Sequence, residues 1–222
     1  MCFSPEVDLV VGTAIAVVAV DAIRNCPSQR AIPLALMPMA FALHTFESAL
    51  VWCGFNNWVP AWLSDAAEYG YLMFAFAILP LYVPLAIGLI EPVIWRRRLL
   101  WLVEFIGIVG GGAYAIALLN GHGQATACNL YIDFDIANAS PIAGLAYPIA
   151  TVGAALLSSY RPISIWGISN VFVTAFLVFW NQHGLASLWC FYAAATSVFI
   201  ALFLRQLPRE PNASGLGWHL PK

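Results

Sequence analysis

Long apolar stretches alternate with short polar segments along the whole chain. The apolar core of a bilayer is about 30 Å thick, and a helix needs about 20 mostly apolar residues to cross it. Because lipid offers the backbone no hydrogen-bond partner, such stretches fold as helices, whereas a barrel would show short alternating strands. The pattern predicts seven transmembrane helices, over residues 7–23, 31–53, 68–91, 99–119, 142–160, 163–181 and 187–206.

The composition agrees with a chain surrounded by lipid. Of 222 residues, 62% are hydrophobic and 9% are charged, whereas a soluble domain is roughly 45–50% apolar and about 25% charged. This excludes a disordered chain, a soluble enzyme and a nucleic-acid-binding protein. The expected fold class is all-α: a polytopic membrane protein with seven transmembrane helices in one bundle. One domain would cover residues 1–207, and residues 208–222 would form a short tail.

The charged residues orient these helices in the membrane. Basic residues are enriched in cytoplasmic loops, so their side should face the cytoplasm, with the N-terminus outside and the C-terminus and tail in the cytoplasm. The opposite side is acidic, with Glu6, Asp8, Asp65, Glu68, Asp133 and Asp135. All nine basic residues fall on the same side of the predicted helices: Arg24, Arg30, Arg96, Arg97, Arg98, Arg161, Arg205, Arg209 and Lys222.

A polar patch lies inside the second predicted helix. His44, Glu47 and Ser48 are three or four residues apart and therefore share one helix face. An ionisable group at membrane depth costs at least a few kcal/mol, so it faces protein or a wet cavity. His44 and Glu47 could be a mutually satisfied pair that fixes helix packing. They could also bind a ligand, or serve as catalytic acid and base.

Two residues near the outer ends of other helices could extend this patch into a binding pocket. Tyr69 begins the third predicted helix, and His183 follows the sixth. Each has an ordinary alternative, because Tyr69 could be an interfacial aromatic residue and His183 a solvated loop residue.

The cysteines suggest further chemistry on the outer side. Cys2, His44, Glu47 and Cys190 are candidate ligands of a bound metal ion, and the sequence identifies no cofactor beyond that possibility. Cys2 and Cys190 could instead form a disulfide, or remain free thiols. Two further cysteines, Cys53 and Cys128, map to the same side, so several pairings are open.

Two other features concern packing and the outer surface. The outer segment 120–141 is long enough to be a functional lid or an ordinary surface loop. Gly107-xxx-Gly111 is a small-xxx-small pattern that permits close helix approach, and packing inside the molecule is favoured over a dimer face. Prolines within the predicted helices, among them Pro80 and Pro148, predict kinks.

Three stretches of sequence resemble a family of small bacterial multi-pass membrane proteins of unknown function. These are Met1-Cys2-Phe3-Ser4, residues 41–44 followed by Glu47 and Trp52, and residues 187–191. The resemblance implies a protein of the bacterial cytoplasmic (inner) membrane, and it supplies no activity.

Three functions are compatible with these observations. The first is an inner-membrane protein whose outward-facing polar pocket (His44, Glu47, Cys2 and Cys190) binds a small ligand, lipid, pigment or metal, or which is a subunit of a membrane complex. The second is a membrane-embedded enzyme, either a metal-assisted hydrolase or a thiol redox enzyme. The third is a small-solute transporter, which the lack of an internal repeat makes least favoured. The bilayer is the expected partner, with other membrane-protein subunits as candidates.

Overall fold

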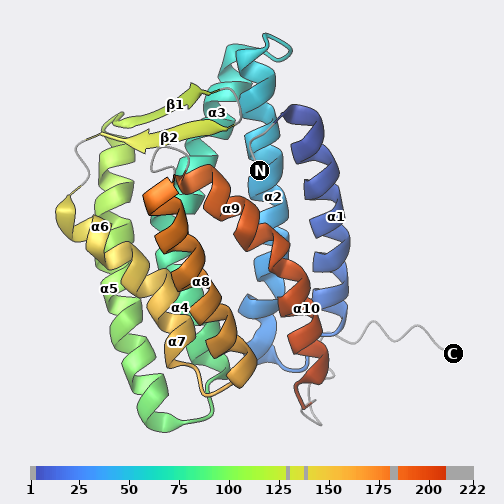
Figure 1. The fold of residues 1–222 in the computed structure, drawn as a ribbon, viewed down its shortest axis with the longest axis vertical. Helices are drawn as coiled ribbons and strands as arrows, with labels where there is room; N and C mark the ends of the chain where they lie inside the picture. Colours follow the sequence, from blue (N-terminus) through green and yellow to red (C-terminus); the bar gives the residue numbers. More distant parts are fainter. Residues whose placement is uncertain (1–3, 129–130, 138–139, 181–184, 209–222) are drawn as a thin grey trace, which may run out of the picture.

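The computed structural model describes residues 4–128, 131–137, 140–180 and 185–208. These form a bundle of helices that run alternately up and down, with a β-hairpin over one end (Figure 1). We call this end the hairpin end, and the other the basic end. The helices are α1 (Pro5–Arg24), α2 (Ile32–Phe55), α3 (Ala61–Leu72), α4 (Leu79–Ile90), α5 (Ile94–Leu119), α6 (Pro141–Pro148), α7 (Ala154–Leu157), α8 (Arg161–Trp180), α9 (Leu185–Ala195) and α10 (Ser197–Gln206).

Each predicted apolar stretch is helical over most of its described length, but not every stretch could cross a bilayer by itself. Within the described ranges, four helical segments are long and apolar enough: Gln29–Phe55, Ala61–Ile90, Ile94–Leu119 and Arg161–Trp180. The first stretch, α1, has 20 residues but includes Glu6, Asp8, Asp21 and Arg24. The last stretch divides into α9 and α10. In length and composition, these four segments are typical of membrane-spanning helices.

Two of the predicted helices change geometry next to a proline. The π-helical segment η2 (Met73–Ile78) joins α3 to α4 just before Pro80, and η3 (Ile149–Gly153) joins α6 to α7 just after Pro148. Proline has no backbone N–H and clashes with the carbonyl four residues earlier, so the α-helical ladder is interrupted near it. The predicted irregularities at these prolines therefore take the form of π-helical turns.

Segment 120–141 contains a β-hairpin, which adds two short strands to the mostly helical fold that the sequence predicted. Strand β1 (Gly123–Ala127) pairs antiparallel with β2 (Ile132–Ile136). The apolar residues of β2 alternate with Asp133 and Asp135, and this period of two is the signature of a strand with one buried face. Ser187 of α9 donates a hydrogen bond to the Ile132 carbonyl and so fastens the hairpin to the bundle.

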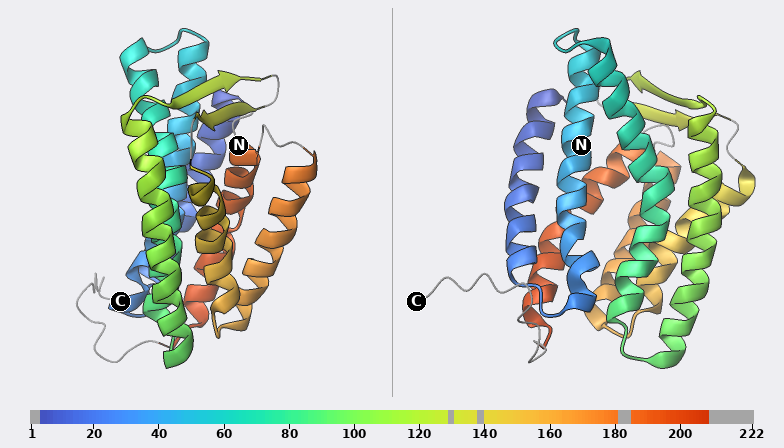
Figure 2. Two further views of the ribbon diagram at one scale, coloured as in Figure 1. Left: turned by 90° about the vertical axis from the view of Figure 1, so that its left-hand side faces the viewer. Right: turned by 180° about the vertical axis from the view of Figure 1, so that it is seen from behind.

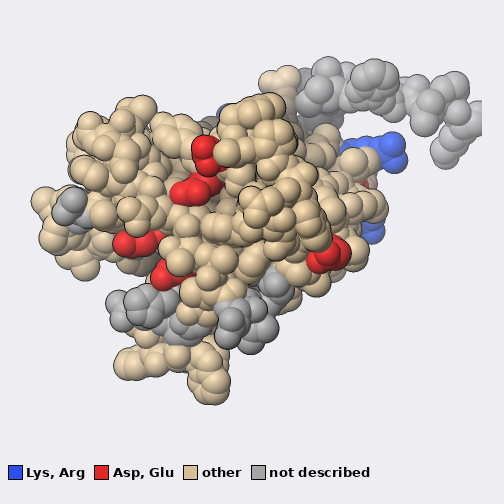
Figure 3. Space-filling view, turned by 90° about the horizontal axis from the view of Figure 1, so that it is seen from above, with Lys and Arg blue, Asp and Glu red and all other residues tan. Residues whose placement is uncertain are grey.

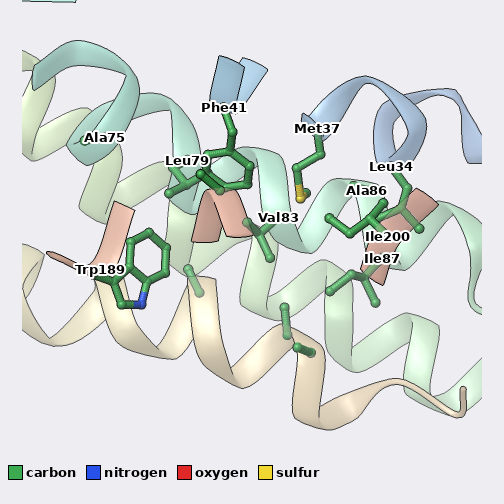
Figure 4. Close-up of a cluster of buried hydrophobic side chains, with 14 of the residues drawn as sticks. Leu34, Met37, Phe41, Ala75, Leu79, Val83, Ala86, Ile87, Trp189 and Ile200 are labelled. Carbon is green, nitrogen blue, oxygen red and sulfur yellow. The ribbon is translucent and has the colours of Figure 1, made fainter. Parts of the chain in front are cut away.

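The apolar core fills the centre of the bundle, where α2 and α4 meet the C-terminal helices α9 and α10 (Figure 4). Its side chains are almost entirely buried, and they come from segments far apart in the sequence. The principal members are Leu34, Met37, Phe41, Leu79, Val83, Ile87 and Ile200.

Glycines allow α5 to approach the neighbouring helix very closely. A Cβ atom on Gly107 would lie 2.1 Å from the Pro80 carbonyl oxygen, and one on Gly111 would lie 2.3 Å from the Ala77 carbonyl oxygen. The small-xxx-small pattern therefore serves packing inside the molecule, as predicted.

Basic residues lie at the end of the bundle opposite the hairpin, where Arg205 of α10 also forms an ion pair with Asp21 of α1. The end of α1, the starts of α5 and α8 and the end of α10 all lie opposite the hairpin (Figures 1 and 2). Arg24, Arg96, Arg161 and Arg205 are at those helix ends. Seen from the hairpin end, the surface carries acidic side chains, with basic ones only at its edge (Figure 3).

Candidate functional site

The predicted contact between His44 and Glu47 is present on α2. The His44 Nδ1 atom lies 3.6 Å from a Glu47 carboxylate oxygen, and the two side chains are 3% and 33% exposed. The His44 ring stacks on Tyr71 of α3, with centroids 3.8 Å apart and an interplanar angle of 23°. His44 is thus held within a packed interface of α2 and α3, close to one partially exposed carboxylate.

Ser48 brings a second carboxylate to this patch. Its hydroxyl donates a 2.6 Å hydrogen bond to Oδ2 of Asp8, which lies on α1 and is fully buried. A hydrogen bond to a carboxylate is stronger than one between neutral groups, because the acceptor is charged. The described patch therefore consists of His44, Glu47 and Ser48 from α2 and Asp8 from α1.

Asp8 lies in the first turn of α1, at the same end of the bundle as the other predicted acidic residues, but its side chain is buried. Asp8 falls in the same helical stripe as Gly12, Ile15, Ala19 and Ala22, all of them buried. The spacing of four, three, four and three residues is that of one helix face, and this face packs on α2. Because Asp8 continues the helical spacing of these apolar residues, the sequence already contained the information that its side chain faces inward.

Tyr69 does not share the surroundings of Tyr71. Two residues along a helix point to nearly opposite faces, so only Tyr71 reaches His44. Tyr71 in turn stacks on Phe134 of the hairpin, with centroids 3.8 Å apart. Tyr69 is 41% exposed and lines a separate groove of about 200 Å³ with Asp65 and Glu68. A binding role for Tyr69 with His44 stays a prediction that this geometry does not favour.

The remaining predicted members of the site lie where the structure gives no side-chain position. Cys2 and His183 are outside the described residues, and Cys190 is on α9 with its side chain not described. Among the described residues, no group of three or more His, Cys, Asp or Glu side chains could hold a metal ion. The metal site and the Cys2–Cys190 disulfide therefore stay predictions. Cys26, Cys53 and Cys128 are free thiols.

A cavity of about 750 Å³ lies under the hairpin. Its walls come from η2, α5, β2, α6, η3, α8 and α9, so it could not be located from any one segment. It is lined by Ala75, Phe76, Tyr114, Asp133, Phe134, Asp135, Ile136, Gly144, Tyr147, Pro148, Thr151, Val152, Thr174, Val178, Leu185 and Trp189. Ligand cavities usually measure about 300–1,000 Å³, so this one has the size of a small-molecule site.

Aromatic rings form much of the cavity wall. The ring of Tyr147 lies 6.0 Å from Phe76, 6.3 Å from Tyr114 and 6.3 Å from Trp189, measured between centroids. The rings belong to four different elements and support one another in tilted or edge-to-face arrangements, which aromatic pairs prefer. They give the cavity a preformed apolar wall.

The cavity also offers hydrogen-bonding groups. The hydroxyl oxygen of Thr174 on α8 is buried and has no hydrogen-bond partner among the described residues. A buried hydroxyl without a partner is unfavourable, so a bound molecule that pairs with it gains that hydrogen bond. Asp133 and Asp135 of β2 stand at the hairpin end of the same cavity. The cavity is thus apolar along its walls and polar at isolated points.

Phe134 connects the cavity to the polar patch. It lines the cavity and stacks on Tyr71, which stacks on His44. The two features are neighbours separated by aromatic rings. The predicted polar patch is therefore a packed wall beside the cavity.

The chain belongs to DUF6629, a family of unknown function, whose model matches residues 1–214. Searches of curated proteins and of solved structures found no match.

Proposed function

We propose that this member of a family of unknown function is an integral membrane protein that binds a small amphiphilic molecule in the cavity under the hairpin. The observation that carries the proposal is the cavity itself: about 750 Å³, bounded by aromatic rings and by a Thr174 hydroxyl that has no partner within the described part of the chain. Small-molecule sites are typically concave and mostly apolar with a few placed polar groups.

The proposed setting is a bacterial inner membrane crossed seven times, with the hairpin outside. The up-and-down course of the helices and the collection of described basic residues at one end support it. In this arrangement α1, the α6–α7 segment and the α9–α10 segment also cross, packed against the four longer apolar segments. Charged residues such as Asp8 are tolerated because they face protein. The cavity then lies in the outer half of the membrane.

The residues that line the cavity determine which kind of ligand it can bind. Apolar walls favour an acyl chain or a similar hydrocarbon body, and each buried CH₂ group contributes about 0.8 kcal/mol. Asp133 and Asp135 at the hairpin end disfavour a negatively charged head, because like charges repel. The expected ligand is therefore an amphiphile with a neutral, zwitterionic or cationic head.

A fluorescent polyene phosphatidylcholine, which brightens in apolar surroundings, tests this proposal on the detergent-purified protein. We expect saturable binding, because the cavity offers a finite apolar site. Thr174→Trp should weaken binding at least about tenfold by filling the cavity from α8. Ala175→Trp is the matched control, since Ala175 is the next residue on α8, is exposed and does not line the cavity.

The binding experiment has results that support the proposal and results that contradict it. Loss of binding in Thr174→Trp with retention in Ala175→Trp supports the proposal. Non-saturable uptake by the unmodified protein overturns it, and so does equal affinity in both variants.

A membrane-embedded enzyme is the second candidate, favoured by the convergence of His44, Glu47, Ser48 and Asp8. His44 would act as acid or base, oriented by Glu47. The predicted pocket that adds Cys2 and Cys190 would supply metal or thiol chemistry. A stoichiometric metal in the purified protein that is lost in His44→Ala would support this candidate.

A further inference from the structure

The helices on the two sides of the cavity diverge toward the hairpin end. At the basic end α7 and α8 are close, and a Cβ atom on Gly167 would lie 2.9 Å from the Leu156 backbone nitrogen. From there α8 packs on α7 and η3, whereas α6 packs on α5. Both side views show α6 and α8 separating toward the hairpin (Figures 1 and 2).

Residues of both diverging helices line the cavity. Gly144 and Pro148 of α6 form one side, and Thr174 and Val178 of α8 form the other. Gly144, Pro148 and Val178 are also exposed, so the cavity reaches the molecular surface between α6 and α8, and we call this place the opening. This opening faces sideways, perpendicular to the long axis of the bundle.

The surface around the opening is apolar. On α6, Leu145 next to Gly144 is 70% exposed, and on α8, Val178 and its neighbour Phe179 are 46% and 90% exposed. In water such a surface would be unfavourable, but lipid chains cover it without cost. The cavity wall is thus continuous with the surface that the proposed orientation places against lipid.

Gly144 stands at the edge of the opening and leaves it clear. A Cβ atom built on Gly144 would meet no atom within 4 Å, so open space lies beside it. A large side chain can be added there without displacing the backbone.

We infer that the cavity is a lipid site entered from the outer half of the bilayer, through the opening between α6 and α8. The occupant is a membrane lipid that inserts one acyl chain sideways while its head stays near the hairpin. This inference rests on the proposed function and adds the ligand class and its route.

Exchange between the cavity and the bilayer tests the route. Protein loaded with the polyene phosphatidylcholine is reconstituted into vesicles of unlabelled phosphatidylcholine, and the decay of tryptophan-to-polyene energy transfer reports exit. Entry is measured by the reverse mixing. Gly144→Phe should slow exit and entry together, each by at least about tenfold, with Kd little changed, since it obstructs the passage in both directions.

Two further variants sharpen the comparison. Gly112→Phe on α5 is the matched control, because its Cβ also meets nothing within 4 Å and Gly112 does not line the cavity. Val178→Trp obstructs the opening from α8 and tests the route independently of any folding defect in Gly144→Phe.

Slow exchange in Gly144→Phe and Val178→Trp, with normal exchange in Gly112→Phe, supports the inference. Unchanged exchange in both obstructing variants overturns it, since the lipid would then use another path. A weaker Kd with an unslowed entry rate also overturns it, because the new side chains would only be filling the site. If the unmodified protein holds no probe at all, the proposed function itself fails.

Discussion

Asp8 is a carboxylate with no exposed surface, and the Ser48 hydroxyl that donates to it comes from a position forty residues later. Burying a charge is costly unless hydrogen bonds replace its water. The close α1–α2 packing around Gly12 brings the two side chains together: a Cβ atom there would lie 2.8 Å from the Phe46 ring. Asp8 and Ser48 therefore fix the register of α1 on α2, beside His44.

Ser48→Ala should destabilise the protein by about 1–3 kcal/mol, because it removes a donor from a buried carboxylate. The measurement is the free energy of unfolding in mixed micelles. Thr13→Ala is the control, since the Thr13 hydroxyl donates only to the Leu9 carbonyl on an exposed face of α1. A loss in Ser48→Ala no larger than that in Thr13→Ala would contradict this role.

Helix α5 shows how a whole element depends on a row of small residues. Gly107 and Gly111 face carbonyl oxygens of the adjoining η2–α4 segment, whereas Gly112 meets nothing within 4 Å. The irregular π-helical turn and Pro80 occur in this segment, where the backbones approach most closely. Close approach increases van der Waals contact, which drives helix association in lipid.

Gly111→Ala should destabilise the protein by about 1–3 kcal/mol, because its Cβ would overlap the backbone oxygen of Ala77, which cannot rotate away. Gly112→Ala, one residue further along, should be neutral or stabilising by about 0.5–1 kcal/mol. Unfolding of both variants in detergent provides the measurement. Equal changes in the free energy of unfolding at the two positions would show that helix propensity, rather than packing, determines the effect of these substitutions.

The molecule as a whole has two chemically different ends. Basic residues mark the ends of helices opposite the hairpin, and acidic residues mark the hairpin end (Figure 3). Both proposals depend on this polarity, since the lipid opening lies in the outer half only if the hairpin faces outward. Cys128 follows β1 at the hairpin end, and Cys26 lies between α1 and η1 (Gln29–Ala31) at the other.

Thiol labelling tests the orientation in intact bacterial cells. In variants that retain a single cysteine, an impermeant maleimide should label Cys128 in intact cells and Cys26 only after permeabilisation. Burial raises the pKa of the Cys26 thiol, so less thiolate is present at neutral pH and labelling should accelerate as the pH rises. The permeabilised sample is therefore labelled at alkaline pH. Labelling of Cys26 in intact cells would reverse the proposed orientation.

Much of the architecture follows from the sequence because it depends on local properties. A run of about 20 apolar residues forms a helix in lipid whatever its neighbours are, and the separation of basic and acidic segments follows from counting those runs. The same holds for the contact of His44 with Glu47, since residues three apart on a helix are neighbours.

Only the tertiary structure shows which contacts form between segments that are far apart in the sequence. The hydrogen bond of Ser48 to Asp8 and the stacking of Tyr71 on Phe134 join residues far apart in the chain. The cavity is lined by Gly144 of α6 and Val178 of α8, two helices that separate toward the hairpin (Figure 2). Hydropathy and spacing describe one segment at a time, whereas a cavity forms where several segments fail to touch. The sequence by itself thus determined a polarised helical membrane protein, and the packing of its helices determined where a ligand fits.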